Sequence, residues 1–306
     1  MSKKMRANIL LLITAMVWGL SFVSQVEGMK TVGPITFQGI RLICAAIVLI
    51  PVVMFMGKKN AEPEMPLEEK QKNKKGTIIG GICCGCALFA ACLLQQFGCQ
   101  YTTAGKAAFI TTLYVVVVPI LSLFLRKRVR PIMWLCVVLG VVGLYLLAMP
   151  NGLESVALGD TYVILCAVAY AVHILCCDHF VAKYDGVKIS FIQFLFAGVI
   201  GCIAMFIFET PDWEAIKSCA VNILYVGCIS GGVGYTLQIV AQKHAEPTVA
   251  SLLMSLESVF GVLFGTLILS EAMTGREILG CVVIFAAVII SNLPEKKVKL
   301  PDSQAG

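Results

Sequence analysis

The chain alternates from end to end between long apolar stretches and short polar or charged ones. Ten of the apolar stretches have about the length of a helix, and each is bounded by Pro, Gly, Asn or a cluster of charge. A helix needs about 20 mostly apolar residues to cross the hydrocarbon core of a bilayer, and most of these stretches reach that length. They predict transmembrane helices over roughly 7–26, 34–56, 76–97, 104–125, 132–149, 159–177, 189–208, 219–241, 248–270 and 275–293.

Composition supports an all-α polytopic membrane protein. Apolar residues make up 58% of the chain and the mean hydropathy is +0.89, well above the values of soluble domains. The longest polar segment, 58–75, is rich in Lys and Glu and contains Pro63 and Pro66. We expect this segment to be a disordered connection, and none of the loops is long enough to hold a soluble domain.

The distribution of positive charge predicts the orientation. If the N-terminus is cytoplasmic, nineteen of the 24 Lys and Arg residues fall in cytoplasmic segments and four in outer ones. Cytoplasmic loops carry such an excess, so both termini are expected in the cytoplasm of a multi-pass protein of the cytoplasmic (inner) membrane. The first stretch has no small-residue cleavage site and is read as a retained helix. The net charge of +6 then reflects this bias and some attraction to anionic lipid, and no nucleic-acid partner is expected.

The fourteen cysteines lie almost entirely inside the predicted helices, where a thiol behaves as a small apolar packing residue. Cys83 and Cys86 form a C-x-x-C pattern, but no His or carboxylate lies near it in the sequence. We therefore expect no metal and no cofactor.

The two halves of the chain are similar to each other. A shift of 152 residues places 15–26 on 167–178 and Trp18 on Tyr170, and a shift of 143 places 101–125 on 244–268. Five helices in each half is an odd number, so the second copy would enter the membrane upside down. Inverted repeats of this kind are common in secondary transporters, with the substrate near the midplane. The predicted division is 1–150, 151–295 and a cytoplasmic tail, 296–306.

Several segments resemble the EamA family of the drug/metabolite transporter superfamily. The first repeat of that family is similar to "AMVWGLSFV" (15–23), "VGPITFQGIRLICAA" (32–46) and "YTTAGKAAFITTLYVVVVPIL" (101–121), and its last helices to "HAEPTVASLLMSLESVFGVLFGTLILSE" (244–271). The resemblance implies a ten-helix transporter of small metabolites such as amino acids, sugars, nucleobase-like compounds, vitamins or drugs, often moved outward. One departure is Ser258, which stands where the family usually has Pro.

Two ionisable residues lie deep in the predicted helices. Glu257 is about nine residues into its helix, roughly 14 Å from the interface, and an acid at such a depth is a candidate proton carrier. The alternative is a structural hydrogen bond or a pair with Arg41. The Arg41 guanidinium can fork onto a substrate carboxylate, snorkel to the outer interface, or brace the helices. Gln38 shares its helix face.

A face of the first helix carries Trp18, Phe22 and Gln25, and its repeat counterpart carries Tyr170, with His173 one turn away. These faces are candidate walls of a central pocket, although packing between helices explains aromatic stripes equally well. The remaining candidates for substrate contact are polar residues of four other helices, which can also serve as interhelical hydrogen bonds. They are Gln95, Thr111, Tyr114, Tyr235 and Gln238. Pro119 predicts a kink.

These observations favour a secondary transporter that works by alternating access on a small-molecule substrate, with protons as a candidate coupling ion. No Walker-type nucleotide-binding motif occurs. The alternative is a membrane-embedded enzyme acting on lipid, which would need clustered acids or histidines that the sequence lacks. Monomer and homodimer both remain open.

Overall fold

The protein is described by a computed structural model covering residues 2–59, 66–101, 104–149, 158–269 and 273–293. All regular secondary structure in these ranges is helical. The elements are α1 (Lys3–Gly28), α2 (Pro34–Lys59), α3 (Leu67–Tyr101), α4 (Ala104–Thr112), α5 (Tyr114–Phe124), α6 (Pro131–Ala148), α7 (Leu158–Val181), α8 (Gly186–Phe208), α9 (Trp213–Ser218), α10 (Ala220–Leu224), the π-helix η1 (Tyr225–Tyr235), α11 (Thr236–Gln242), α12 (Pro247–Met254), α13 (Leu256–Leu269) and α14 (Gly275–Ser291).

The helices fit a polytopic membrane protein. Within the described residues, eight helical segments are long and apolar enough to cross a bilayer, and Pro131–Leu147 in α6 is a shorter apolar helix. The eight are α1, α2 up to Phe55, α3, Ala107–Phe124, α7, α8, Ala220–Gln242 and Pro247–Phe264. Many large apolar side chains, among them Ile47, Phe55 and Phe206, are exposed, which suits a surface surrounded by lipid.

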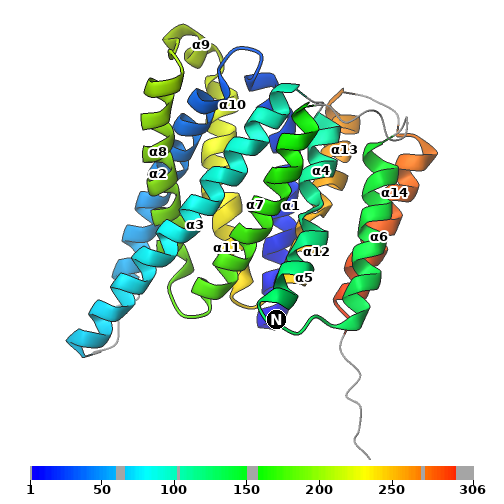
Figure 1. Ribbon diagram of the computed structural model, residues 1–306, viewed down its shortest axis with the longest axis horizontal. Helices are drawn as coiled ribbons and strands as arrows, with labels where there is room; N and C mark the ends of the chain where they lie inside the picture. Colours follow the sequence, from blue (N-terminus) through cyan, green and yellow to red (C-terminus); the bar gives the residue numbers. More distant parts are fainter. Residues whose placement is uncertain (1, 60–65, 102–103, 150–157, 270–272, 294–306) are drawn as a thin grey trace, which may run out of the picture.

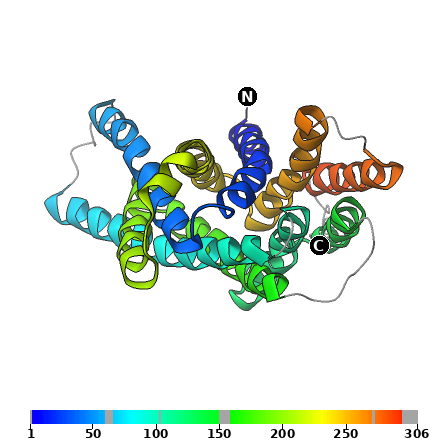
Figure 2. The same ribbon diagram turned by 90° about the horizontal axis from the view of Figure 1, so that it is seen from above.

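The bundle has α1 near its middle and helix pairs at its two edges (Figures 1 and 2). α1 packs against η1, α11 and α13, while α7 packs against α3, α4 and α5. α2 crosses α8, and α6 lies beside α14 at the opposite edge. Each of these contacts joins a helix of the first half of the chain to one of the second half.

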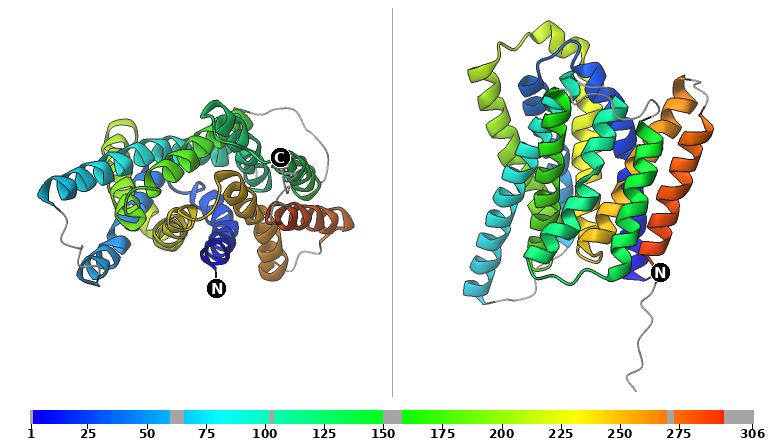
Figure 3. Two further views of the ribbon diagram at one scale, coloured as in Figure 1. Left: turned by 90° about the horizontal axis from the view of Figure 1, so that it is seen from below. Right: turned by 45° about the vertical axis from the view of Figure 1, so that its right-hand side comes forward.

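The start of α1 and the end of α14 lie on the same side of the bundle (Figure 3). The Asn8 amide donates to Asn292 Oδ1 across 2.7 Å. The Arg130 guanidinium donates to the carbonyls of Ser291 and Leu293 at the end of α14. Arg130 therefore satisfies carbonyls that a helix C-terminus leaves without internal partners.

The connection expected to be disordered over 58–75 is in part helical. α2 continues to Lys59 and α3 begins at Leu67, while 60–65 lie outside the described residues. Glu68 and Glu69 occupy the first turn of α3, where acidic side chains favour a helix N-terminus. The polar residues 67–75 thus form the first turns of α3, whose apolar part follows them.

Two spans are interrupted at corresponding places. One break falls at Leu113, between α4 and α5, and the other at Ser255, between α12 and α13. Pro119, where a kink is expected, lies inside the continuous helix α5, and the break in this span lies six residues earlier. Thr112 Oγ1 and Ser258 Oγ lie 3.0 Å apart, which joins the two interrupted spans.

Two glycines bring helix backbones into close contact. A Cβ atom on Gly227 of η1 would lie 2.6 Å from the Arg41 carbonyl oxygen, and one on Gly85 of α3 would lie 3.0 Å from the Gln193 carbonyl oxygen. No larger residue fits at Gly227 without moving α2 and η1 apart. Small residues at such crossings are typical of membrane helices.

Candidate functional site

A cavity lies in the interior of the bundle, between elements of both halves. Its volume is about 30 Å³, room for about two water molecules. Its lining comes from α1, α2, α3, α4, α5, α7, η1 and α13. The lining residues are Trp18, Ser21, Phe22, Gln25, Arg41, Gln95, Thr111, Tyr114, Tyr170, Ser230, Tyr235 and Glu257.

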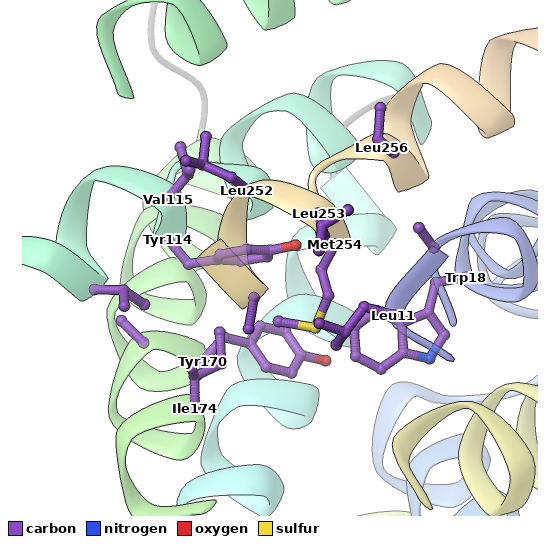
Figure 4. Close-up of a cluster of buried hydrophobic side chains, with 14 of the residues drawn as sticks. Leu11, Trp18, Tyr114, Val115, Tyr170, Ile174, Leu252, Leu253, Met254 and Leu256 are labelled. Atoms are coloured by element: carbon purple, nitrogen blue, oxygen red, sulfur yellow. The ribbon is translucent and has the colours of Figure 1, made fainter. Parts of the chain in front are cut away.

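Aromatic rings form one wall of the cavity. The rings of Trp18 and Tyr235 lie 4.5 Å apart between centroids, and the Tyr235 hydroxyl donates to the Tyr170 hydroxyl across 2.9 Å. Trp18 Nε1 donates to the Ser230 carbonyl across 3.1 Å. In Figure 4, Trp18, Tyr114 and Tyr170 converge on the space between α1, α5 and α7. The rings are held by polar contacts at their tips, which fixes the shape of the wall.

Arg41 brings a buried positive charge to the cavity. Its side chain comes from α2 and the residue is only 3% exposed. Nε donates to Gln38 Oε1 across 2.7 Å, while Nη2 is buried and has no hydrogen-bond partner in the described structure. A guanidinium with an unused nitrogen is suited to binding a carboxylate.

Glu257 brings a carboxyl group to the same cavity. It is the second residue of α13, directly after the break at Ser255, and the Tyr114 hydroxyl donates to its Oε1 across 3.3 Å. An ion pair between Glu257 and Arg41, one of the alternatives from the sequence, is not among the ion pairs of the described residues. The guanidinium and the carboxyl group therefore line one cavity as separate groups.

Amides and hydroxyls complete the polar lining. The Tyr170 hydroxyl donates to Gln95 Oε1 across 3.2 Å, and Gln95 Nε2 donates to Thr111 Oγ1 across 3.3 Å. This chain of hydrogen bonds links α7, α3 and α4. Gln95 and Thr111 thereby hold the Tyr170 ring in place while facing the cavity.

Two serines were missed by the sequence reading. Ser230 Oγ donates to Ser21 Oγ across 3.1 Å, and Gln25 Nε2 donates to the same Ser21 oxygen across 3.3 Å. Gln25 Oε1 is buried without a partner in the described structure. Ser21 lies on the helix face of Trp18 and Gln25, so the same spacing that selected those residues would have found it. Ser230 lies in the π-helix η1, which nothing in the sequence pattern indicated.

Three of the candidate residues lie outside the lining: Gln38, His173 and Gln238. Gln38 contacts the cavity only through Arg41. His173 Nε2 lies 3.0 Å from Gln193 Oε1, and Gln238 Nε2 donates to Gln242 Oε1 across 3.2 Å. Helix spacing places a residue on a face but does not show how far along the bundle the cavity extends. The other ten candidates line it.

The described residues contain no cluster of three or more His, Cys, Asp or Glu side chains placed to hold a metal ion. The cavity instead combines one cation, one carboxyl group, aromatic rings and neutral hydrogen-bonding groups. Such a lining is complementary to a small molecule with both an acidic and a basic end.

One family model matches most of the chain, and two relatives are named as transporters. The model of the EamA-like transporter family matches residues 5–149 and again 157–293. An uncharacterized transporter of Archaeoglobus fulgidus is 27% identical over 95% of this chain and 87% of its own length. The uncharacterized transporter YoaV of Bacillus subtilis is 22% identical over 90% and 93%.

More distant similarity extends to a plant protein and to a solved structure. The chloroplastic WAT1-related protein At3g02690 of Arabidopsis thaliana is 24% identical over 91% of this chain and 67% of its own length. A crystal structure superposes with a TM-score of 0.75 at 16% identity, over 94% of this chain and 96% of that one. That structure supports the fold alone.

Proposed function

The chain belongs to the EamA-like transporter family, and on that premise we propose that it moves a small, amino-acid-like metabolite across the cytoplasmic membrane by alternating access. The observation that carries the proposal is the cavity, in which the Arg41 guanidinium and the Glu257 carboxyl group lie among aromatic rings. An amino-acid-like molecule has a carboxylate for Arg41 and an amino group for Glu257 or the tyrosine hydroxyls.

We further propose ten spans arranged as two inverted five-helix repeats. With α6 and α14 added to the eight long segments, the count is ten, and a shift of 152 residues relates Arg41 to Gln193. Gly227 packs on Arg41 as Gly85 packs on Gln193, so equivalent contacts recur in the two halves. The breaks at Leu113 and Ser255 also fall at nearly equivalent positions.

The size of the cavity supports alternating access. At about 30 Å³ it is too small for any metabolite, so the helices around it must separate before a substrate can bind. The interrupted spans and η1 line this cavity, and interrupted helices at the midplane are a common feature of secondary transporters. In the proposed cycle the two halves rock against each other and expose the cavity to one side at a time.

The orientation and direction of transport are part of the proposal. The excess of Lys and Arg supports cytoplasmic termini, and export follows the tendency of the family that the chain resembles. Glu257 is the proposed carrier of a coupling proton, since an intramembrane acid lining a cavity is suited to that task.

The test is a thermal-shift screen of purified protein in detergent against amino acids, sugars, nucleosides and vitamins. Each stabilising compound is then tested for counterflow in proteoliposomes. A zwitterionic compound that stabilises the protein and exchanges across the bilayer would support the proposal. Exchange of neutral sugars alone would overturn the assignment of Arg41 and Glu257. Stabilisation without exchange would argue against transport.

A further inference from the structure

A second group of buried polar side chains lies beside the cavity but outside its lining. His173 Nε2 is 3.0 Å from Gln193 Oε1 and 3.4 Å from Cys177 Sγ. All three residues are fully buried. In the proposed orientation α7 runs from the outer side inward, so His173 and Cys177 lie on the cytoplasmic side of Tyr170.

Two polar atoms of this group have no hydrogen-bond partner in the described structure. They are His173 Nδ1 and Gln193 Nε2. Buried polar atoms without partners are rare in native proteins, and each one needs an explanation. With Nε2–H donated to Gln193 Oε1, His173 Nδ1 carries a lone pair and accepts hydrogen bonds. The group therefore has one unused acceptor, His173 Nδ1, and one unused donor, Gln193 Nε2.

The second group is the repeat counterpart of the Arg41 end of the cavity. The shift of 152 residues that places Trp18 on Tyr170 also places Ser21 on His173 and Arg41 on Gln193. The packing of Gly227 against Arg41 and of Gly85 against Gln193 repeats this correspondence in space. Residues that face a pathway in one half thus have counterparts in the other.

The Tyr235 ring contacts residues of both groups. Its centroid lies 4.5 Å from that of Trp18, which lines the cavity, and 5.9 Å from that of His173, which does not. Its hydroxyl is hydrogen-bonded to the Tyr170 hydroxyl, and Cys92 Sγ lies 3.2 Å from the Tyr170 hydroxyl. Tyr235 is therefore the residue whose movement would change the contact between the two groups.

We propose that His173 and Gln193 form a second substrate subsite, which opens to the cytoplasm when Tyr235 separates from Tyr170. The inference rests on the proposed transport function and adds the chemistry of the inward-facing state. Because His173 Nδ1 has an unused lone pair and the neutral Gln193 stands in place of Arg41, the subsite takes N–H or O–H groups of the substrate. The substrate carboxylate stays with Arg41.

Cys177 reports directly on this opening, since its sulfur contacts His173. Everted membrane vesicles and right-side-out vesicles are treated with a membrane-impermeant cationic methanethiosulfonate, and each cysteine is quantified by peptide mass spectrometry. We expect Cys177 to be modified from the cytoplasmic side only, and faster in Tyr235→Phe, which loses the hydroxyl bond to Tyr170. Cys166, equally buried on the outer half of α7, is the matched control and is expected to stay unmodified from that side.

The ligand chemistry is tested by protection of Cys177. Leucine and phenylalanine are compared with their 2-oxo acids, which keep the carboxylate and lack the amino N–H groups. The subsite is supported if Cys177 is labelled more slowly in the presence of the amino acids than of the oxo acids, and if this difference disappears in His173→Phe. Equal labelling of Cys177 from both sides, no labelling, or equal effects of both compound classes overturns it. Failure of the transport proposal is seen separately, as absence of counterflow while Cys177 still opens to the cytoplasm.

Discussion

Tyr114 and Glu257 meet across the centre of the bundle, with the tyrosine hydroxyl donating to the glutamate carboxylate over 3.3 Å. Tyr114 is the first residue of α5 and Glu257 the second of α13, so each directly follows the break in its span. The shift of 143 residues relates these two positions in the repeat. The contact therefore joins the two interrupted helices where their backbones are least regular.

This contact leads to a prediction for Glu257→Gln. The amide keeps the size of the side chain and can still accept from Tyr114, but it cannot carry a proton. We expect counterflow to persist at a rate lowered by the weaker contact with the substrate amino group, while accumulation driven by a pH gradient is lost. Both are measured in proteoliposomes. Tyr114→Phe, which keeps the acid, is the control and should retain gradient-driven transport; unimpaired coupling in Glu257→Gln would rule out the proposed role.

Arg41→Lys is expected to weaken binding of carboxylate substrates. Lysine keeps the charge but loses the planar fork, and it also loses the Nε bond to Gln38. We expect affinity to fall about tenfold to a hundredfold, corresponding to about 1.5–3 kcal/mol for a hydrogen bond to a charged group. The measurement is calorimetry on purified protein. An amide derivative of the same substrate is the comparison, and an equal loss for both compounds would contradict carboxylate binding at Arg41.

Gly227→Ala tests the close contact of η1 with α2. The added methyl group would lie 2.6 Å from the Arg41 carbonyl oxygen, so the helices must move apart. We expect a loss of about 1–3 kcal/mol in stability, seen as a lower thermal midpoint in detergent. Gly275→Ala at the start of α14 is the matched control, because no atom lies within 4 Å of the position that its added Cβ would take. Similar midpoints for the two variants would count against a tight crossing.

Arg130→Gln tests the attachment of the C-terminal end of α14. The guanidinium binds the carbonyls of Ser291 and Leu293 and lies 3.6 Å from a Glu246 carboxylate oxygen. Loss of these bonds at a partly buried site is expected to lower stability by about 1–2 kcal/mol. The control is Lys217→Gln, whose ion pair with Glu214 is exposed and should contribute little. Thermal unfolding of both variants is compared, and equal effects would show that Arg130 is not an anchor.

The sequence predicted a helical membrane protein because every span must be apolar to lie in the hydrocarbon core, whatever its neighbours are. Trp18 could be selected because it shares a helix face with Phe22 and Gln25, and Tyr170 because the repeat relates it to Trp18. The spacing could not separate His173 and Gln238 from the cavity, since depth along the bundle depends on how helices are offset. The break at Leu113 was also out of reach, because Pro119 was the visible signal and α5 continues through it. The π-helix that carries Ser230 has no recognisable sequence pattern.

The length of α3 has a practical consequence. Its 35 residues extend over about 52 Å, well beyond a hydrocarbon core of about 30 Å. The excess lies at the Leu67 end, where the residues are exposed and the helix projects from the bundle in Figure 1. Because the helix is continuous from there to Gln95, a small tilt at the cavity becomes a larger displacement at the tip. A spin label or fluorophore at exposed Gln71 would therefore report movements of the cavity wall from a position outside the cavity.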